Sequence, residues 1–288
     1  MKFSFIEEHR AIFRLARMCR MLGVSKAGYF RWRWRPDSPR TCQDRALKAS
    51  ISVLHAQSRQ TYGSPRIHRD LRDLGTRIGK KRVERLMREA EISARPPRRF
   101  VITTNSKHDF PIAPNLLKQD FSAASPNSRW VTDITYIPTS EGWLFLSAIM
   151  DLYSRRIVGW AMDSSMDCRL VRRALDMAVE SRRPSPGLVH HSDRGSQYAS
   201  AEYRSDLSKR GIVPSMSRRA CCYDNAAMES FFHTLKVELT HRYEFQTRDQ
   251  AKRVIFEYIE VFYNRLRRHS SIGYISPVDF EQRLAAAA

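Results

Sequence analysis

The sequence predicts an α/β domain that is preceded by an all-α region, and three observations support this division. From about residue 127 to residue 212, apolar and β-branched runs follow one another in the order strand, strand, strand, helix, strand, helix. The first hundred residues instead show helical spacing and carry 25 Lys and Arg against 9 Asp and Glu. The 288-residue chain is 42% hydrophobic and 28% charged, which is typical of a globular protein.

The basic charge is concentrated at the N-terminus. The first hundred residues carry +16 of the +20 net charge of the chain. This asymmetry favours a nucleic-acid-binding arm ahead of a more balanced globular domain. A first helix-turn-helix is predicted at residues 16–30, where Leu22 ends one helix, Gly23 forms the turn and Ser25 caps the next helix.

A second helix-turn-helix is predicted from residue 62 onward. Ser64 is expected to cap a helix, and Pro65 suits the first helical position. Three apolar residues then recur at helical spacing: Ile67, Leu71 and Leu74. Gly75 breaks this helix, so a second one is expected to begin shortly after it.

The helix that follows is amphipathic and basic. Its apolar residues, Val83, Leu86 and Met87, are expected to face inward. Its other faces carry five basic side chains: Lys80, Lys81, Arg82, Arg85 and Arg88. We expect these side chains to contact DNA phosphates, with one or two of them reading base edges. The alternative is a helix whose basic face is only solvated.

Residues 96–126 are predicted to form a linker, because prolines are scattered through them and no hydrophobic period is sustained. We therefore expect a helical region with a helix-turn-helix over residues 1–60 and a basic helix-turn-helix-like region over residues 61–95. Residues 127–288 are expected to form a catalytic core that ends in a C-terminal helix.

Four strands are predicted in the core: Trp130–Pro138, Leu144–Leu152, Arg156–Met162 and Leu188–His191. The first has apolar residues on both faces, as in a central strand that is covered on both sides. A helix between the third and fourth strands is marked by Leu170, Ala174, Met177 and Ala178, and it ends before Pro184. Three antiparallel strands followed by a helix-linked fourth strand is the order of the RNase H-like fold.

Three acids, Asp133, Asp193 and Glu229, form the candidate active site. Asp133 lies inside an apolar run, where an unpaired charge is costly. Asp193 ends the fourth apolar run, and 35 residues separate it from Glu229. Acids at the ends of different elements can converge to hold two Mg²⁺ ions, which activate an attacking hydroxyl and stabilise the leaving oxygen of a phosphodiester. The alternative is three solvated surface carboxylates.

Glu229 falls on a predicted helix that runs from Asn225 to about Leu239. The apolar stripe of this helix consists of Met228, Phe232, Leu235 and Leu239. The neighbouring polar stripe consists of Asn225, Glu229, His233 and Lys236. We expect Lys236 to meet a phosphate, and His233 either to donate a hydrogen bond to substrate or to have no role. Asp224, the main competitor of Glu229 as a metal ligand, is expected to cap the helix.

Two histidines precede Asp193 in the fourth strand. Alternation places His191 on the same face as Asp193 and His190 on the opposite face. We expect both histidines to support the site or the fold rather than to bind metal. Asp151, at the end of the second strand, is expected to cap a turn or to pair with Arg155 or Arg156.

Four stretches of the chain resemble the signatures of a known family. Residues 130–137, 191–198 and 223–232 resemble the three blocks of the retroviral-integrase-like DDE transposases. Residues 263–273 resemble the C-terminal signature of the second-reading-frame product of IS-three family insertion sequences. One departure is visible: a Gly-Asn pair is expected before the third block, where this chain has Ala220-Cys221.

The resemblance implies an RNase H-like catalytic core with a mixed five-stranded sheet, in which the first and fourth strands are neighbours and Asp133 faces Asp193. It implies metal-dependent DNA strand cleavage and strand transfer during transposition. Asp133, Asp193 and Glu229 would be catalytic and would hold two Mg²⁺ ions, for which Mn²⁺ can substitute. Asn225, His191 and His233 would lie just behind these acids. The alternatives are a DNA-binding regulator with a vestigial core and a nuclease without strand transfer.

The partners implied by the resemblance are double-stranded DNA of the element ends and target, and further copies of the chain on that DNA. An upstream-frame helix-turn-helix protein, or a fusion to it, is also implied. Because the chain starts at Met1 with no heptad pattern, we expect the second frame alone. The five cysteines imply no disulfide framework, and no apolar run reaches the length of a membrane span. We expect a bacterial, cytoplasmic protein associated with the nucleoid.

Overall fold

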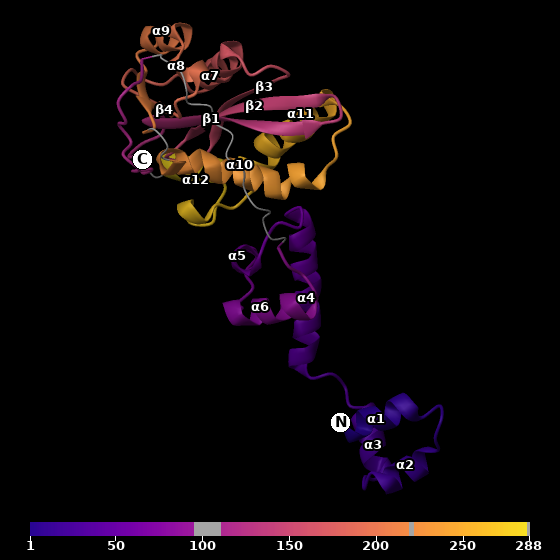
Figure 1. The fold of residues 1–288 in the computed structure, drawn as a ribbon. Helices are drawn as coiled ribbons and strands as arrows, with labels where there is room; N and C mark the ends of the chain where they lie inside the picture. Colours follow the sequence, from indigo (N-terminus) through magenta and orange to yellow (C-terminus); the bar gives the residue numbers. More distant parts are fainter. Residues whose placement is uncertain (95–110, 219–221, 287–288) are drawn as a thin grey trace.

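The computed structural model describes residues 1–94, 111–218 and 222–286. Figure 1 shows the first six helices apart from the sheet, with α4–α6 between the sheet and α1–α3. These helices are α1 (Lys2–His9), α2 (Leu15–Met21), α3 (Lys26–Arg33), α4 (Pro39–Gln57), α5 (Ser64–Asp73) and α6 (Lys80–Glu89). Residues 96–110 of the predicted linker and the Ala220-Cys221 pair lie outside the described residues.

Helices α2 and α3 form the first predicted helix-turn-helix. Gly23 joins them with a φ of +61°, a conformation that favours glycine. The Ser25 hydroxyl accepts a hydrogen bond from the backbone N–H of Gly28 at 2.9 Å and so caps α3. A small core joins α1 to these two helices, and its buried residues are Ile6, Met18, Cys19 and Tyr29. The predicted turn and cap are confirmed.

Helices α4, α5 and α6 share a second small core, which consists of Ile51, Tyr62, Ile67, Leu71, Val83, Leu86 and Met87. The hydrophobic clusters therefore separate between α3 and α4. The prediction that Ser64 caps α5 is wrong, because Ser64 is already helical and Gly63 occupies the cap position. Pro65 then still lies in the first turn, where its missing N–H costs no hydrogen bond. Leu74, just beyond α5, is 69% exposed.

The sheet has five strands: β1 (Arg129–Thr139), β2 (Gly142–Asp151), β3 (Ile157–Asp163), β4 (Val189–Ser192) and β5 (Val213–Met216). Their spatial order is β3-β2-β1-β4-β5. The pairs β1–β2 and β2–β3 are antiparallel, whereas β4 lies parallel to both β1 and β5. The predicted mixed sheet, with its first and fourth strands as neighbours, is confirmed.

Helices cover both faces of this sheet. One face packs against α7 (Cys168–Arg182), α8 (Ser196–Ala199) and α9 (Ala201–Lys209). The other face packs against α10 (Ala226–Glu238), α11 (Arg248–Glu257) and the π-helix η3 (Tyr258–Tyr263). The remaining turns and helix are η1 (Cys222–Asn225), η2 (Thr240–Arg242), η4 (Ser270–Ile272) and α12 (Pro277–Ala285). At Gly159 of β3 an added Cβ would lie 2.3 Å from the carbonyl oxygen of Ala174 in α7, so only glycine permits this close packing.

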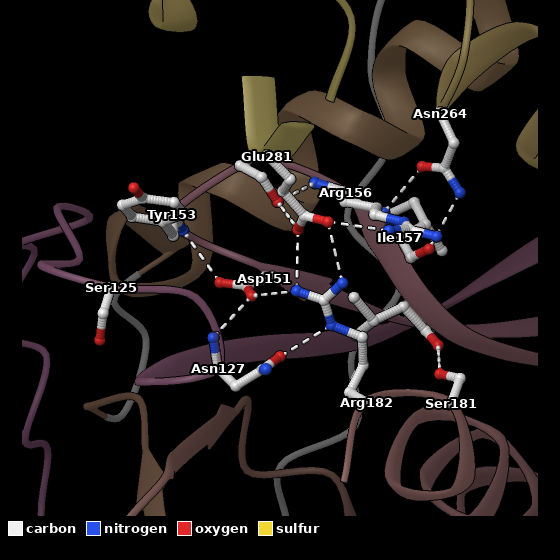
Figure 2. Close-up of polar contacts among 12 residues, drawn as sticks. Ser125, Asn127, Asp151, Tyr153, Arg156, Ile157, Ser181, Arg182, Asn264 and Glu281 are labelled. Atoms are coloured by element: carbon white, nitrogen blue, oxygen red, sulfur yellow. Dashed lines mark hydrogen bonds and ion pairs between the residues drawn. The ribbon is translucent and has the colours of Figure 1, made fainter. Parts of the chain in front are cut away.

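A buried ion-pair network attaches α12 to the sheet (Figure 2). The fully buried carboxylate of Asp151 accepts hydrogen bonds from the backbone N–H groups of Asn127 and Tyr153. Arg182 of α7 lies 3.4 Å from Asp151 and also binds both carboxylate oxygens of Glu281 in α12. The predicted turn cap is thus confirmed. The predicted pairing of Asp151 with Arg155 or Arg156 is wrong, because the partner comes from α7.

The C-terminal signature, residues 263–273, has clear structural contacts. The side-chain amide of Asn264 accepts from the N–H of Ile157 and donates to its carbonyl oxygen, and so protects the edge strand β3 (Figure 2). Arg267 donates to both carboxylate oxygens of Glu238 at the end of α10, and both side chains are buried. This signature therefore locks the C-terminal segment onto the core.

The helical region contacts the core beneath α10 and the C-terminal turn (Figure 1). Arg59 pairs with Glu257 of α11 at 2.6 Å. The Tyr62 hydroxyl accepts a hydrogen bond from the backbone N–H of Arg268, whose side chain binds Asp70 of α5. In the described parts of the chain, no helix has the length and apolar character needed to cross a membrane.

Candidate active site

Asp133 lies on β1, and Asp193 directly follows the neighbouring parallel strand β4. The last residues paired between β1 and β4 are Val131 and His191, so each acid lies two residues beyond this pair, and the charge of Asp193 acts on Asp133. Asp133 shares its face of β1 with Val131 and Ile137, which belong to the core cluster covered by α10. Both carboxylates are anchored, because Asp133 accepts from the N–H of Ile134 at 2.8 Å and Asp193 accepts from that of Gly195 at 2.9 Å.

The electrostatics of Asp133 reflect a crowded group of acids. Burial raises the pKa of Asp133 well above its usual value, and the nearby charges of Asp193 and Glu229 raise it further. Lys236 acts in the opposite direction. The surroundings therefore disfavour the ionised form of Asp133 unless additional positive charge is present.

Glu229 lies in the first turn of α10, whose predicted apolar stripe is confirmed: Met228, Phe232, Leu235 and Leu239 are all buried. The start of this helix is tied to β1, because the side-chain amide of Asn225 donates to the carbonyl oxygen of Thr132 at 3.0 Å. Glu229 is half-buried, and burial raises its pKa. Within the described residues, no three His, Cys, Asp or Glu side chains gather into a group that could hold a metal ion as they stand.

Asp224 has a different role from the one predicted. The N-cap of α10 is Asn225, so the prediction that Asp224 caps the helix is wrong. Its fully buried carboxylate instead accepts hydrogen bonds from the side chains of Asn115 and Gln119 and from the backbone and guanidinium of Arg218. Donors from Arg218 and from the distant segment that holds Asn115 and Gln119 satisfy this carboxylate, which argues against Asp224 as a metal ligand.

The two histidines before Asp193 are buried and neutral. His191 bonds to the hydroxyls of Ser215 and Ser217 at 2.8 and 3.1 Å, and His190 bonds to the Tyr203 hydroxyl at 2.7 Å. Burial lowers the pKa of His190 to about 3 and that of His191 to about 4. Both rings therefore join β4 to its neighbours as uncharged groups.

Two further side chains lie close to the acids. Lys236 is half-buried on α10, and burial lowers its pKa while the charge of Asp133 raises it. Tyr198 was not among the predicted site residues, although it ends the second signature block. Its hydroxyl lies 3.2 Å from that of Thr132. Burial raises the pKa of Tyr198 well above the usual value, and the charge of Asp133 raises it further. Tyr198 thus backs β1 on the face opposite α10.

The predicted DNA-binding helix, α6, lies in the helical region, apart from the sheet and from α10 (Figure 1). Lys80, Lys81 and Arg88 are exposed. Arg82 and Arg85 are half-buried and both bind Asp44 of α4, at 2.6 and 2.7 Å. These two arginines therefore also join α6 to α4.

We expect replacement of Asp133 by Asn to stabilise the metal-free protein. The pKa of Asp133 is higher in the folded protein than in the unfolded chain, where it is about 4. An acid whose pKa is raised on folding destabilises the folded protein increasingly as pH rises from the unfolded-state pKa to the folded-state pKa. The amide of Asn does not ionise, so the substitution removes this effect. Thermal unfolding in EDTA should give a higher Tm for Asp133→Asn than for the unaltered protein at pH 8, with a smaller difference at pH 4. Equal values at pH 8 would contradict the assigned environment.

The family models that match the chain identify an integrase-type core joined to an HTH-like region. Residues 123–222 and 229–284 each match a model described as an integrase core domain, and residues 42–100 match an HTH-like domain. Among solved structures, the simian T-cell lymphotropic virus intasome is similar with a TM-score of 0.48 and 14% identity, covering 80% of this chain and 74% of that chain.

Full-length relatives show the family. The chain is 42% identical to transposase InsF for insertion sequence IS3A of Escherichia coli (strain K12), over 98% of this chain and 99% of the relative. It is 48% identical to an uncharacterized 31 kDa protein of insertion element IS600 from Shigella sonnei, over 92% of this chain and 98% of the relative. The chain belongs to the IS3 family of insertion-sequence transposases, and its function is transposition. The predicted family and fold class are confirmed.

Proposed function

We propose that this transposase cuts DNA at the ends of its element and joins the cut strand to target DNA, with Asp133, Asp193 and Glu229 as its catalytic carboxylates. The observation that carries the proposal is the position of Asp133 and Asp193, each two residues beyond the last β1–β4 pair, where the charges of Asp193 and of Glu229 on α10 both act on Asp133. Burial raises the pKa of Asp133, and the charges of Asp193 and Glu229 raise it further, as expected for acids that lie near one another. Carboxyl groups with perturbed pKa values are typical of functional sites.

The donor set fits Mg²⁺, because carboxylate oxygens are hard ligands and their combined charge attracts a cation. We propose that Asp133, Asp193 and Glu229 hold two Mg²⁺ ions, for which Mn²⁺ can substitute. The bound metal would supply an activated hydroxyl and stabilise the leaving oxygen of the phosphodiester. Glu229 has a side chain long enough to swing toward Asp133 while α10 stays packed.

Other side chains would position the DNA around these acids. Lys236 lies near Asp133, where its ammonium can hold a phosphate beside the carboxylates. Asn225 keeps the start of α10 against β1, so that Glu229 stays in register with Asp133. His233 lies on the same polar stripe and is proposed to donate a hydrogen bond to the bound strand. His191 supports the end of β4 through its two serine partners.

We further propose that the helical regions over residues 1–60 and 61–95 bind the element ends, that residues 96–126 link them to the core, and that residues 127–288 perform the chemistry. The chain would assemble with further copies on double-stranded DNA. An upstream-frame helix-turn-helix protein, supplied separately or as a fusion, would add to end recognition.

Incubation of the purified protein with labelled element-end duplexes, Mg²⁺ and a target duplex tests the proposal. We expect a nicked strand at the element end, followed by a product in which the freed 3′ end is joined to target. Hydrolysis without joining would identify a nuclease. Specific binding without either product would identify a regulator. Either of these two outcomes, hydrolysis alone or binding alone, would contradict the proposal.

We expect the exposed basic residues of α6 to carry DNA binding separately from catalysis. Replacing Lys80, Lys81 and Arg88 by Ala should weaken binding to all sequences and lower the slope of log K against log salt by about 0.9 for each phosphate that no longer meets a basic side chain. Arg82→Ala serves as the contrast, because Arg82 binds Asp44 and its loss should cost about 1 kcal/mol of folding stability. An unchanged slope in the triple variant would mean that these residues only solvate the helix.

A further inference from the structure

A cavity of about 270 Å³ opens between α10, the turn that joins β2 to β3, and the C-terminal turn. Arg66 of α5 also lines it, so residues of both the helical region and the core form its wall. Its other charged or polar lining side chains include Arg155, Arg267, His269, Thr234 and Ser271. No Asp or Glu is among the described residues that line it.

Two arginines bring positive charge into this cavity without a carboxylate partner among the described residues. Arg66 donates from Nε to the carbonyl oxygen of Arg268 at 3.0 Å, and Arg155 donates to that of Phe121 at 3.0 Å. Both guanidinium groups are half-buried, and burial lowers the pKa of each. Arg267 differs, because Glu238 neutralises it. Partly buried guanidinium groups that have no carboxylate partner favour the approach of an anion.

The pKa of the buried His269 imidazole is affected by the arginines around the cavity. Burial lowers the pKa of His269 well below its usual value, and the charges of Arg267, Arg66 and Arg155 lower it further. His269 therefore stays neutral and adds a hydrogen-bonding ring without adding charge. Arg66 and Arg155, which come from separate segments of the chain, thus both act on this ring at the cavity wall.

We propose that this cavity binds a phosphate group of the DNA backbone. Guanidinium forks with nearby hydroxyl groups match the oxygens of a phosphate, and the volume leaves room for one phosphate with ordered water. The cavity is separate from the acids, because Ser230 and Thr234 lie about 100° and 140° around α10 from Glu229. The inference rests on the proposed function for its choice of DNA. A phosphate held here would connect Arg66 of the helical region to the core.

The test combines two measurements on the full chain. Thermal unfolding is followed with increasing inorganic phosphate against sodium chloride of equal ionic strength, and binding of a short duplex is measured as a function of salt. In the Arg66→Gln/Arg155→Gln variant we expect the phosphate-dependent rise in Tm to vanish and the salt slope to fall by about 0.9 or more. Arg253→Gln, which alters an exposed arginine of α11, is the matched control and should change neither.

Substitutions at Ser271 distinguish loss of the anion site from misfolding of the double arginine variant. Ser271 is exposed at the cavity, so Ser271→Asp should fold and repel the anion, whereas Ser271→Ala loses one hydroxyl but no positive charge and should keep most of the phosphate protection. Phosphate protection that persists in both the double variant and Ser271→Asp would overturn the site. Loss of protection with an unchanged DNA slope would assign the cavity to free phosphate and overturn the DNA assignment. Failure of the catalytic proposal would appear separately, in the strand-transfer assay of the unaltered protein.

Discussion

Asp133→Asn, Asp193→Asn and Glu229→Gln should each reduce strand cleavage and strand transfer by about 1,000-fold or more, which corresponds to about 4 kcal/mol of transition-state stabilisation. The amides keep the size of the acids but lose the charge that a divalent cation requires. DNA affinity should stay within about threefold, because Lys and Arg contacts to phosphate supply most of the binding energy. Cleavage and gel-shift assays on the same preparations measure both quantities.

Asp163→Asn is a suitable control for these variants. Asp163 also ends a strand of the sheet, but it lies on β3 at the far edge and pairs with Arg173. Its amide should retain activity. Mg²⁺ should also raise the Tm of the unaltered protein and not that of the variant with all three acids replaced. Full activity in any one of the three single variants would remove that acid from the site.

Arg182→Met should destabilise the core by about 3–5 kcal/mol, the usual cost of removing one partner from a buried ion pair. Arg182 is 13% exposed, and its loss would leave the carboxylates of Asp151 and Glu281 without their shared guanidinium (Figure 2). Arg156 would remain beside Glu281, whereas Asp151 would keep only backbone donors. Denaturant unfolding followed by circular dichroism measures the change.

Arg173→Met in the same helix provides the comparison. Arg173 also pairs with an aspartate, Asp163, but its side chain is 51% exposed, so its loss should cost about 1 kcal/mol or less. If the two arginine variants were equally stable, the network around Asp151 would not hold α12 to the sheet. If adding Asp151→Asn to Arg182→Met restored the free energy of unfolding, the unpaired charge of Asp151 would be the cause of the lost stability.

Much of the core could be predicted because the hydrophobic patterns of its strands and helices match the residues that are buried in the fold. The apolar run around Asp133 became the central strand, and the four apolar residues of α10 became its buried stripe. Their periodicity reports which side faces the core, so Glu229 could be placed at its margin. Ser64 was assigned wrongly because a serine beside a proline satisfies the rules for both the cap and the first turn.

What the sequence by itself determined is most of the core elements and, through the family resemblance, the fold class, since these depend on periodicity and on signatures contained in short segments. Only the tertiary structure decided which charges pair. Asp224 is bound by the segment around Asn115, Arg82 and Arg85 bind Asp44, and Asp151 binds Arg182. Each of these partners lies tens of residues away along the chain. Chain separation carries no information about distance once the sheet and its helices have closed, so ion pairs and the cavity beneath α10 depend on packing.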